Sequence, residues 1–86
     1  MAEIEIGKIS HYFGKIGVAA IDITAGELKV GDTIHIKGPT SDFTQTVDSM
    51  EVEHENVESA KPGDSVGLKV TEHARVTDTV YLVTED

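Results

Sequence analysis

The chain has 86 residues, with sixteen acidic and seven basic side chains and a formal net charge of −9. It has no cysteine, which excludes disulfides and thiol chemistry, and no apolar run approaching the roughly 20 residues of a membrane span. Its acidity disfavours nucleic acids and anionic membranes as partners, because their recognition depends on Lys and Arg, and it favours solubility.

The absence of cysteine and the start of the sequence fit a reducing compartment. MAEIEIGKIS has neither the basic start nor the apolar run of a signal peptide, and we expect a cytoplasmic location. The Met1 start and the polar Thr84-Glu85-Asp86 end resemble those of a complete chain. At this length we expect one domain, residues 1–86, around one core.

The apolar residues recur with a period of two, which predicts strands rather than helices. Near the N-terminus, Ile4 and Ile6 alternate with glutamates, and Val66 and Leu68 alternate with Gly67 and a lysine. The expected strands are residues 3–9, 16–23, 32–37, 43–48, 49–53, 64–70 and 79–84. A single helical turn at 56–61, before a proline, is the one helical candidate.

Two segments break the alternation. Residues 18–21 are apolar on both faces, and Val47 is out of phase with Met50 and Val52. Such slips suggest β-bulges, which bend strands and help a small sheet to close into a barrel.

A short pattern occurs three times, namely Asp, a hydroxyl residue and a β-branched residue. It begins at Asp32, Asp64 and Asp78. An Asp next to Ser or Thr could be catalytic, but an Asp side chain that bonds nearby backbone in a turn explains all three copies. We therefore expect three turns, each leading into a strand.

The segment HYFGKIG holds two of the four aromatic residues of the chain, side by side before two glycines. We expect it to form a hairpin loop, with His11, Tyr12, Phe13 and Lys15 as candidate binding residues. The aromatic pair could close the end of a barrel, anchor a protein partner, or stack on unpaired bases with His11 and Lys15 near phosphate. The net charge weighs against the last alternative.

The segment EVEHE resembles a metal site at first sight. Glu51, Glu53 and Glu55 would line one face of a strand, next to His54, but such neighbours are about 7 Å apart. A solvated charged face that protects a sheet edge is the simpler interpretation. The four histidines are scattered, without HxH or HExxH, so we expect no metal site.

No arrangement of nucleophile and base indicates catalysis. Ser10 and His11 are adjacent, and neighbours on a strand face opposite ways. Glu51 and Glu53 could form a carboxylate pair, but no cleft is evident around them. We therefore expect neither enzymatic activity nor a cofactor.

Two long runs carry a resemblance to a known family. GVAAIDITAGELKVGDTIHIKG, followed by VDSMEVEHENVESAKPGDSVGLKV, resembles the second domain of translational GTPases such as elongation factor Tu and initiation factor 2. The match covers residues 7–84 and rests on the order and spacing of several short motifs. It implies an all-β fold, a small closed antiparallel Greek-key barrel of six to seven strands.

The resemblance does not bring the family's activities with it. No P-loop GxxxxGK[ST] is present, so GTP binding and hydrolysis are not expected. Where elongation factor Tu places an acidic pair and a hydroxyl residue against tRNA, this chain has Gly7, Lys8 and Ala20. A similar barrel also occurs as an accessory domain at the C-terminal end of some peptidases, so the fold alone does not define a function.

The sequence thus predicts a non-catalytic, translation elongation factor-like binding module that contacts an unidentified protein through residues 11–15. Self-association is compatible with this prediction, and a membrane partner is not expected. The alternatives are a module that contacts tRNA or the ribosome, and an accessory barrel for a separately encoded enzyme.

Overall fold

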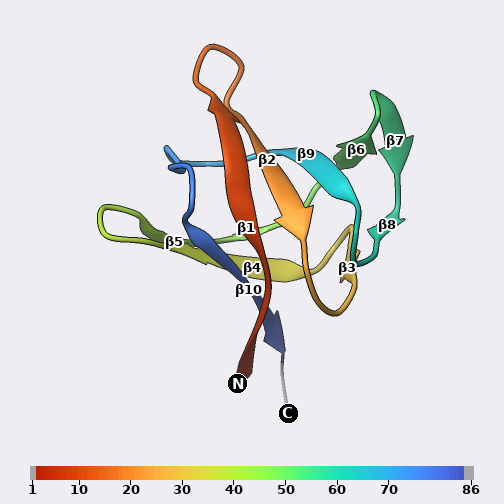
Figure 1. The fold of residues 1–86 in the computed structure, drawn as a ribbon, viewed down its shortest axis with the longest axis horizontal. Coiled ribbons are helices and arrows are strands. Elements are labelled where there is room, and N and C mark those ends of the chain that lie inside the picture. Colours follow the sequence, from red (N-terminus) through yellow and green to blue (C-terminus); the bar gives the residue numbers. More distant parts are fainter. Residues whose placement is uncertain (1, 85–86) are drawn as a thin grey trace.

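A computed structural model describes residues 2–84 as strands joined by turns (Figure 1). No helix occurs in this range, which confirms the all-β prediction. The described residues therefore contain no helix able to cross a membrane. Residue 1 and residues 85–86, which were part of the expectation of a complete chain, lie outside the described range. The strands are β1 (Ala2–Phe13), β2 (Val18–Ile23), β3 (Leu28–Lys29), β4 (Thr33–Lys37), β5 (Asp42–Thr46), β6 (Met50–Val52), β7 (Glu55–Val57), β8 (Ser59–Ala60), β9 (Ser65–Lys69) and β10 (Thr79–Thr84).

Eight of the strands form one antiparallel sheet. Its order is β5-β4-β10-β1-β2-β9-β6-β7, and β3 pairs separately with β8. The long strand β1 lies at the centre, since it pairs with β10 on one side and β2 on the other. Ala2 pairs with Thr84, so both ends of the described chain lie together, opposite the hairpin that joins β1 to β2 (Figure 1).

The structure contains more strands than expected. Each of the seven predicted segments holds one, but β3, β7 and β8 are additional. The prediction of a helical turn at 56–61 is wrong. Glu53 and His54 adopt φ angles of 53° and 66° and reverse the chain, so β7 pairs with β6 as a strand. Ala60 is then buried in β8, where it pairs with Leu28.

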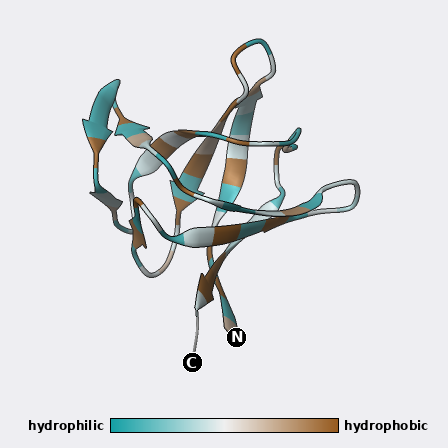
Figure 2. Ribbon diagram, turned by 180° about the vertical axis from the view of Figure 1, so that it is seen from behind, coloured by the Kyte–Doolittle hydropathy of each residue, from teal (hydrophilic) through white to brown (hydrophobic). Residues whose placement is uncertain are grey.

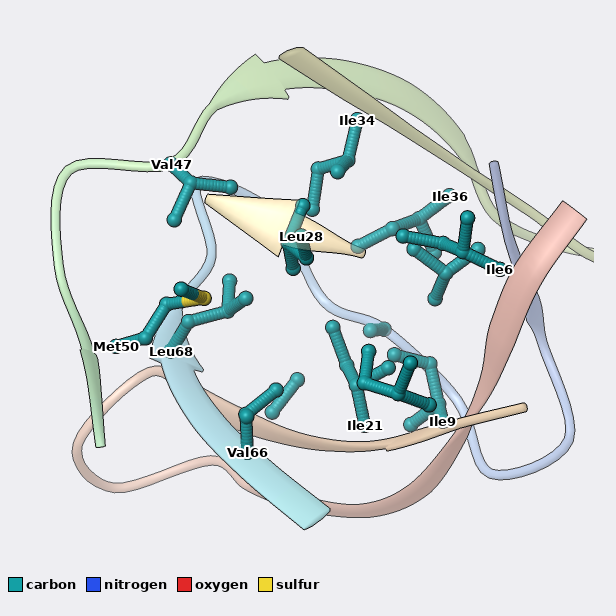
Figure 3. Packing of buried hydrophobic residues seen from close by; sticks show 14 of the residues in the cluster. Ile6, Ile9, Ile21, Leu28, Ile34, Ile36, Val47, Met50, Val66 and Leu68 are labelled. Atoms are coloured by element: carbon teal, nitrogen blue, oxygen red, sulfur yellow. The ribbon is translucent and has the colours of Figure 1, made fainter. Parts of the chain in front are cut away.

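The buried apolar side chains form one cluster inside the curved sheet (Figure 3). Alternate residues of the strands supply it, as the period of two predicts; Ile34 and Ile36 of β4 face Ile21 of β2 and Val66 of β9 across the interior. Complete burial of each such side chain contributes about 1.5–3 kcal/mol. The core therefore holds together strands that are far apart in the sheet order.

The closed barrel is unsupported. Within residues 2–84 the hydrogen-bonded order ends at β5 and β7, which do not pair with each other. Instead of a strand ladder, the side-chain amide of Gln45 spans from β5 towards β9. It donates to the carbonyl of Lys69 and accepts from the backbone N–H of Thr71, both at 2.8 Å. β5 ends at Thr46 and the chain leaves it as a loop, so no strand pairing continues there.

The bulges lie in β1, and their expected positions are wrong. Ile6 and Ser10 are the extra residues, opposite β10 and β2 respectively. The pairing of β2 with β9 has no shift, and Val47 falls between β5 and β6. Ser10 Oγ donates to the carbonyl of Ala20 at 3.3 Å. Because this bulge adds one residue, Tyr12 rather than Phe13 shares the inner face with Ile9.

Candidate functional site

The hairpin between β1 and β2 separates the two neighbouring aromatic residues. Tyr12 pairs with the buried Ala19 and packs against the core cluster. Its ring also stacks on His73, with ring centroids 4.3 Å apart and an interplanar angle of 21°. Tyr12 thus joins the hairpin to the loop before β10.

Phe13 points away from the core and is 46% exposed. His11 lies on the same outer face, and the two ring centroids are 4.3 Å apart. The expected loop at 11–15 begins too early, because the Ser10 bulge lets pairing continue to Phe13. The turn follows at 14–17 and contains the exposed Lys15, and Figure 2 shows both hydrophilic and hydrophobic ribbon in this hairpin tip, beyond the sheet.

A groove of about 490 Å³ opens beside this hairpin, on the outer face of β2, β9 and β6. We call it the outer groove. The hairpin forms one wall, two small residues form the floor, and β6 with the β6–β7 turn forms the other wall. The residues that define it are Phe13 and Ile16, then Ala20 and Gly67, then Glu51, Glu53 and His54.

The floor of the outer groove is set by strand register. Ala20 pairs with Gly67, and Gly67 pairs in turn with Glu51. A Cβ atom at Gly67 would make an ordinary contact, 3.6 Å from Val18 Cγ1. The sheet therefore does not require glycine there, and the missing side chain leaves a trough between the walls.

The far wall carries two carboxylates, Glu51 on β6 and Glu53 on an unusual turn. Val52 pairs with Glu55, so the β6–β7 hairpin has a two-residue loop of Glu53 and His54. Both have positive φ, which is the conformation of a type I′ turn and is normally occupied by Asn or Gly. The prediction that Glu51, Glu53 and Glu55 follow one strand is wrong for this reason.

The other polar cluster joins β1, β4 and β5. His35 Nδ1 is 2.9 Å from Glu3 Oε1, and its Nε2 bonds Asp42. The hydrogen bonds to Asp42 and Glu3 raise the pKa of His35, and the bond to His35 lowers the pKa of Asp42. Both ring nitrogens of His35 are engaged by carboxylates. The cluster therefore stabilises the protonated, cationic form of His35 and leaves neither nitrogen free to act as a base.

The predicted site residues are not assembled into a catalytic or metal-binding arrangement within residues 2–84. No group of three or more His, Asp or Glu side chains in this range could hold a metal ion. The three repeated Asp residues serve turns: each carboxylate accepts from the backbone N–H three residues earlier, at Lys29, Lys61 and Arg75.

Sequence reasoning missed the outer groove, although two signals for it were present. Residues 18–21 are apolar on both faces because Ala19 and Ile21 enter the core while Val18 and Ala20 line the groove. The second signal was Gly67 inside a strand, a position where glycine often marks the close approach of another backbone.

Comparisons with known proteins give a family and a set of relatives. The elongation factor Tu domain 2 family matches residues 17–81. An uncharacterized protease of Methanocaldococcus jannaschii is 42% identical over 84 residues, which are 96% of this chain and 20% of that protein. A collagenase of Porphyromonas gingivalis is 39% identical over 80 residues, 92% of this chain and 19% of that protein. The chain thus spans about a fifth of the length of these relatives.

Among solved structures, the C-terminal domain of a protein described as a U32 peptidase, from Geobacillus thermoleovorans, has the same fold. Its TM-score is 0.87 at 20% identity, over 94% of this chain and 93% of that domain. The predicted resemblance to elongation factor Tu domain 2 is confirmed. The prediction that the chain works as a translation elongation factor-like module is wrong, because the relatives are named protease and collagenase. The predicted alternative of an accessory barrel for an enzyme agrees better with them.

Proposed function

We propose that this chain, which belongs to the elongation factor Tu domain 2 family, is a non-catalytic accessory domain that works beside the catalytic part of a peptidase. One observation carries the proposal. Nearly the whole chain matches proteins named protease and collagenase, yet it corresponds to only about a fifth of each. The remaining four-fifths leave ample length for a separate catalytic part.

The chemistry of the described residues supports a role other than catalysis. Cysteine is absent from the sequence, and His35, the histidine held by two carboxylates, has both ring nitrogens engaged. A hydrolase needs a nucleophile or an activated water beside a base. Within residues 2–84 the Asp–Ser and Asp–Thr pairs are committed to turns through backbone hydrogen bonds.

The placement of the chain ends is compatible with this role. Ala2 and Thr84 pair with each other at the end of the molecule opposite the β1–β2 hairpin (Figure 1). A polypeptide or partner attached at that end leaves the hairpin and the outer groove accessible. We propose Phe13, with its neighbours His11, Tyr12 and Lys15, as part of the surface that acts in this context.

Hydrolysis of fluorescein-labelled collagen tests the proposal. We expect the purified chain alone to release no label above the buffer control. Collagenase of Porphyromonas gingivalis lacking the segment that matches this chain should hydrolyse collagen less efficiently than the intact enzyme, and added chain should restore part of the loss. Hydrolysis that co-purifies with the chain alone would contradict the non-catalytic role.

A further inference from the structure

We propose that the outer groove binds an extended polypeptide segment that carries a large apolar side chain and, two to four residues away, a Lys or Arg. This site goes beyond the role beside a peptidase and does not depend on it. Its wall and floor residues come from the β1–β2 hairpin, from β9 and β6, and from the β6–β7 turn, so the folded sheet preforms it.

The hairpin wall supplies the apolar contact. Phe13 is 46% exposed and Ile16 is 61% exposed, and neither belongs to the core cluster or packs against it. Both line the outer groove. These two side chains are therefore not part of the core packing. An aromatic and a branched aliphatic group remain free to cover an apolar group of a partner.

The floor is shaped for the close approach of a backbone. Glycine inside a strand weakens a sheet, because it packs no side chain and loses more chain entropy on folding. At Gly7 the fold demands glycine, since a Cβ would overlap the carbonyl oxygen of Asp22. At Gly67 it does not, because the same atom would lie at contact distance from Val18. Gly67 therefore serves the groove rather than the sheet.

The far wall supplies negative charge. Within residues 2–84 the ion pairs are formed by Lys29, His35 and their partners, and neither Glu51 nor Glu53 takes part in one. Lys69 also lines the groove, so the two carboxylates outnumber the one lysine there. A cationic side chain of a partner could form an ion pair with these carboxylates. Charge complementarity of this kind sets the specificity and the association rate of binding.

The same charges decide between classes of occupant. An RNA or an anionic membrane would meet carboxylates where it needs Lys and Arg. A second copy of this chain would bring another net charge of −9 to the contact. A peptide with an apolar residue and a cation satisfies both walls. Side chains two residues apart lie on one side of an extended chain, about 7 Å from each other.

An NMR titration of the ¹⁵N-labelled chain tests the site. The probes are the peptides GSFSKSG and GSFSSSKSG, with controls in which serine replaces phenylalanine or glutamate replaces lysine. We expect at least one probe to shift the amide signals of Ala20, Glu51 and Gly67. Each control should bind about tenfold more weakly, and E51Q/E53Q should remove most of the salt dependence of the affinity.

Matched variants separate the groove from the fold. Gly67→Val places a branched side chain in the trough and should abolish the shifts while preserving the melting temperature, since valine favours strands. Thr44→Val, on the exposed part of β5, should bind as the original chain does. Ile16→Ser should weaken binding, and Val76→Ser, at a 53% exposed position outside the groove, should not.

The proposal is overturned if Gly67→Val binds the peptides unchanged, if the controls bind as well as the probes, or if no probe shifts a groove signal at about 1 mM, a weak-binding limit. Binding of an octauridine RNA to the same residues in place of the peptides would also overturn it. Because the isolated chain is titrated, these outcomes are distinct from those of the collagen assay.

Discussion

Replacing Thr77 with glycine should stabilise the protein. Three turns of the chain have the same geometry, in which an Asp carboxylate bonds the backbone N–H three residues earlier. The residue before the Asp has a positive φ in each turn. Gly31 and Gly63 have φ of 97°, whereas Thr77 has φ of 76°. A β-branched residue in this region is a conformational outlier.

The size of the effect follows from two opposing terms. The left-handed conformation costs a residue with a Cβ about 1–2 kcal/mol, and Thr77→Gly removes this cost. Glycine at the same time lowers the stability by about 0.4–1 kcal/mol, because it gives the unfolded chain more conformational freedom. With the middle of each range the net gain is about 0.8 kcal/mol, and for a domain of this size it raises the melting temperature by about 3–6 °C. Urea unfolding and thermal melting both measure it.

The reverse substitutions are the matched controls. A Cβ at Gly31 or Gly63 would meet nothing within 4 Å, so Gly31→Thr and Gly63→Thr test backbone strain without a clash. Each should lower the free energy of unfolding by an amount similar to the gain at Thr77. A neutral or destabilising Thr77→Gly together with harmless Gly31→Thr would refute the reasoning.

Two further predictions concern a charged cluster and a close packing contact. The raised pKa of His35 means that its stabilising contribution is complete below about pH 6.5 and is lost as the pH rises through the folded-state pKa. The lowered pKa of Asp42 means that its carboxylate stabilises the fold at pH values above the ordinary pKa of Asp. This stabilisation is lost as the pH falls through the folded-state pKa. Urea unfolding of His35→Gln between pH 5 and 8 should therefore show less pH dependence than the original chain, and an unchanged slope would contradict this. Gly7→Ala should cost about 1–3 kcal/mol by overlap with an opposing backbone carbonyl, whereas Gly67→Ala should be neutral or stabilising; equal effects in urea unfolding would contradict the contrast.

The sequence predicted the parts of the fold that depend on strand periodicity. Ile34 and Ile36 alternate with polar residues, Val66 and Leu68 alternate with a glycine and a lysine, and all four are buried as expected. The shortest strands were missed because two or three residues carry too little pattern. The reversal at Glu53 was missed because neither it nor His54 is a usual residue for positive φ.

The candidate site was harder to predict, because it depends on one extra residue in β1. The Ser10 bulge leaves no mark in the apolar pattern, yet it turns Tyr12 inward and Phe13 outward. The segment HYFGKIG therefore has two roles, an aromatic contact with His73 and an exposed wall of the outer groove. Local sequence could not show which aromatic residue takes which role.

The most direct test of the account is a collagenase of Porphyromonas gingivalis in which this chain replaces the matching segment, which is 39% identical over 80 residues. We predict that this chimera hydrolyses collagen with a kcat/KM well above that of the enzyme lacking the segment, and that Gly67→Val in the chimera raises KM more than it lowers kcat. A chimera that folds and is no more active than the truncated enzyme would contradict a role beside a peptidase.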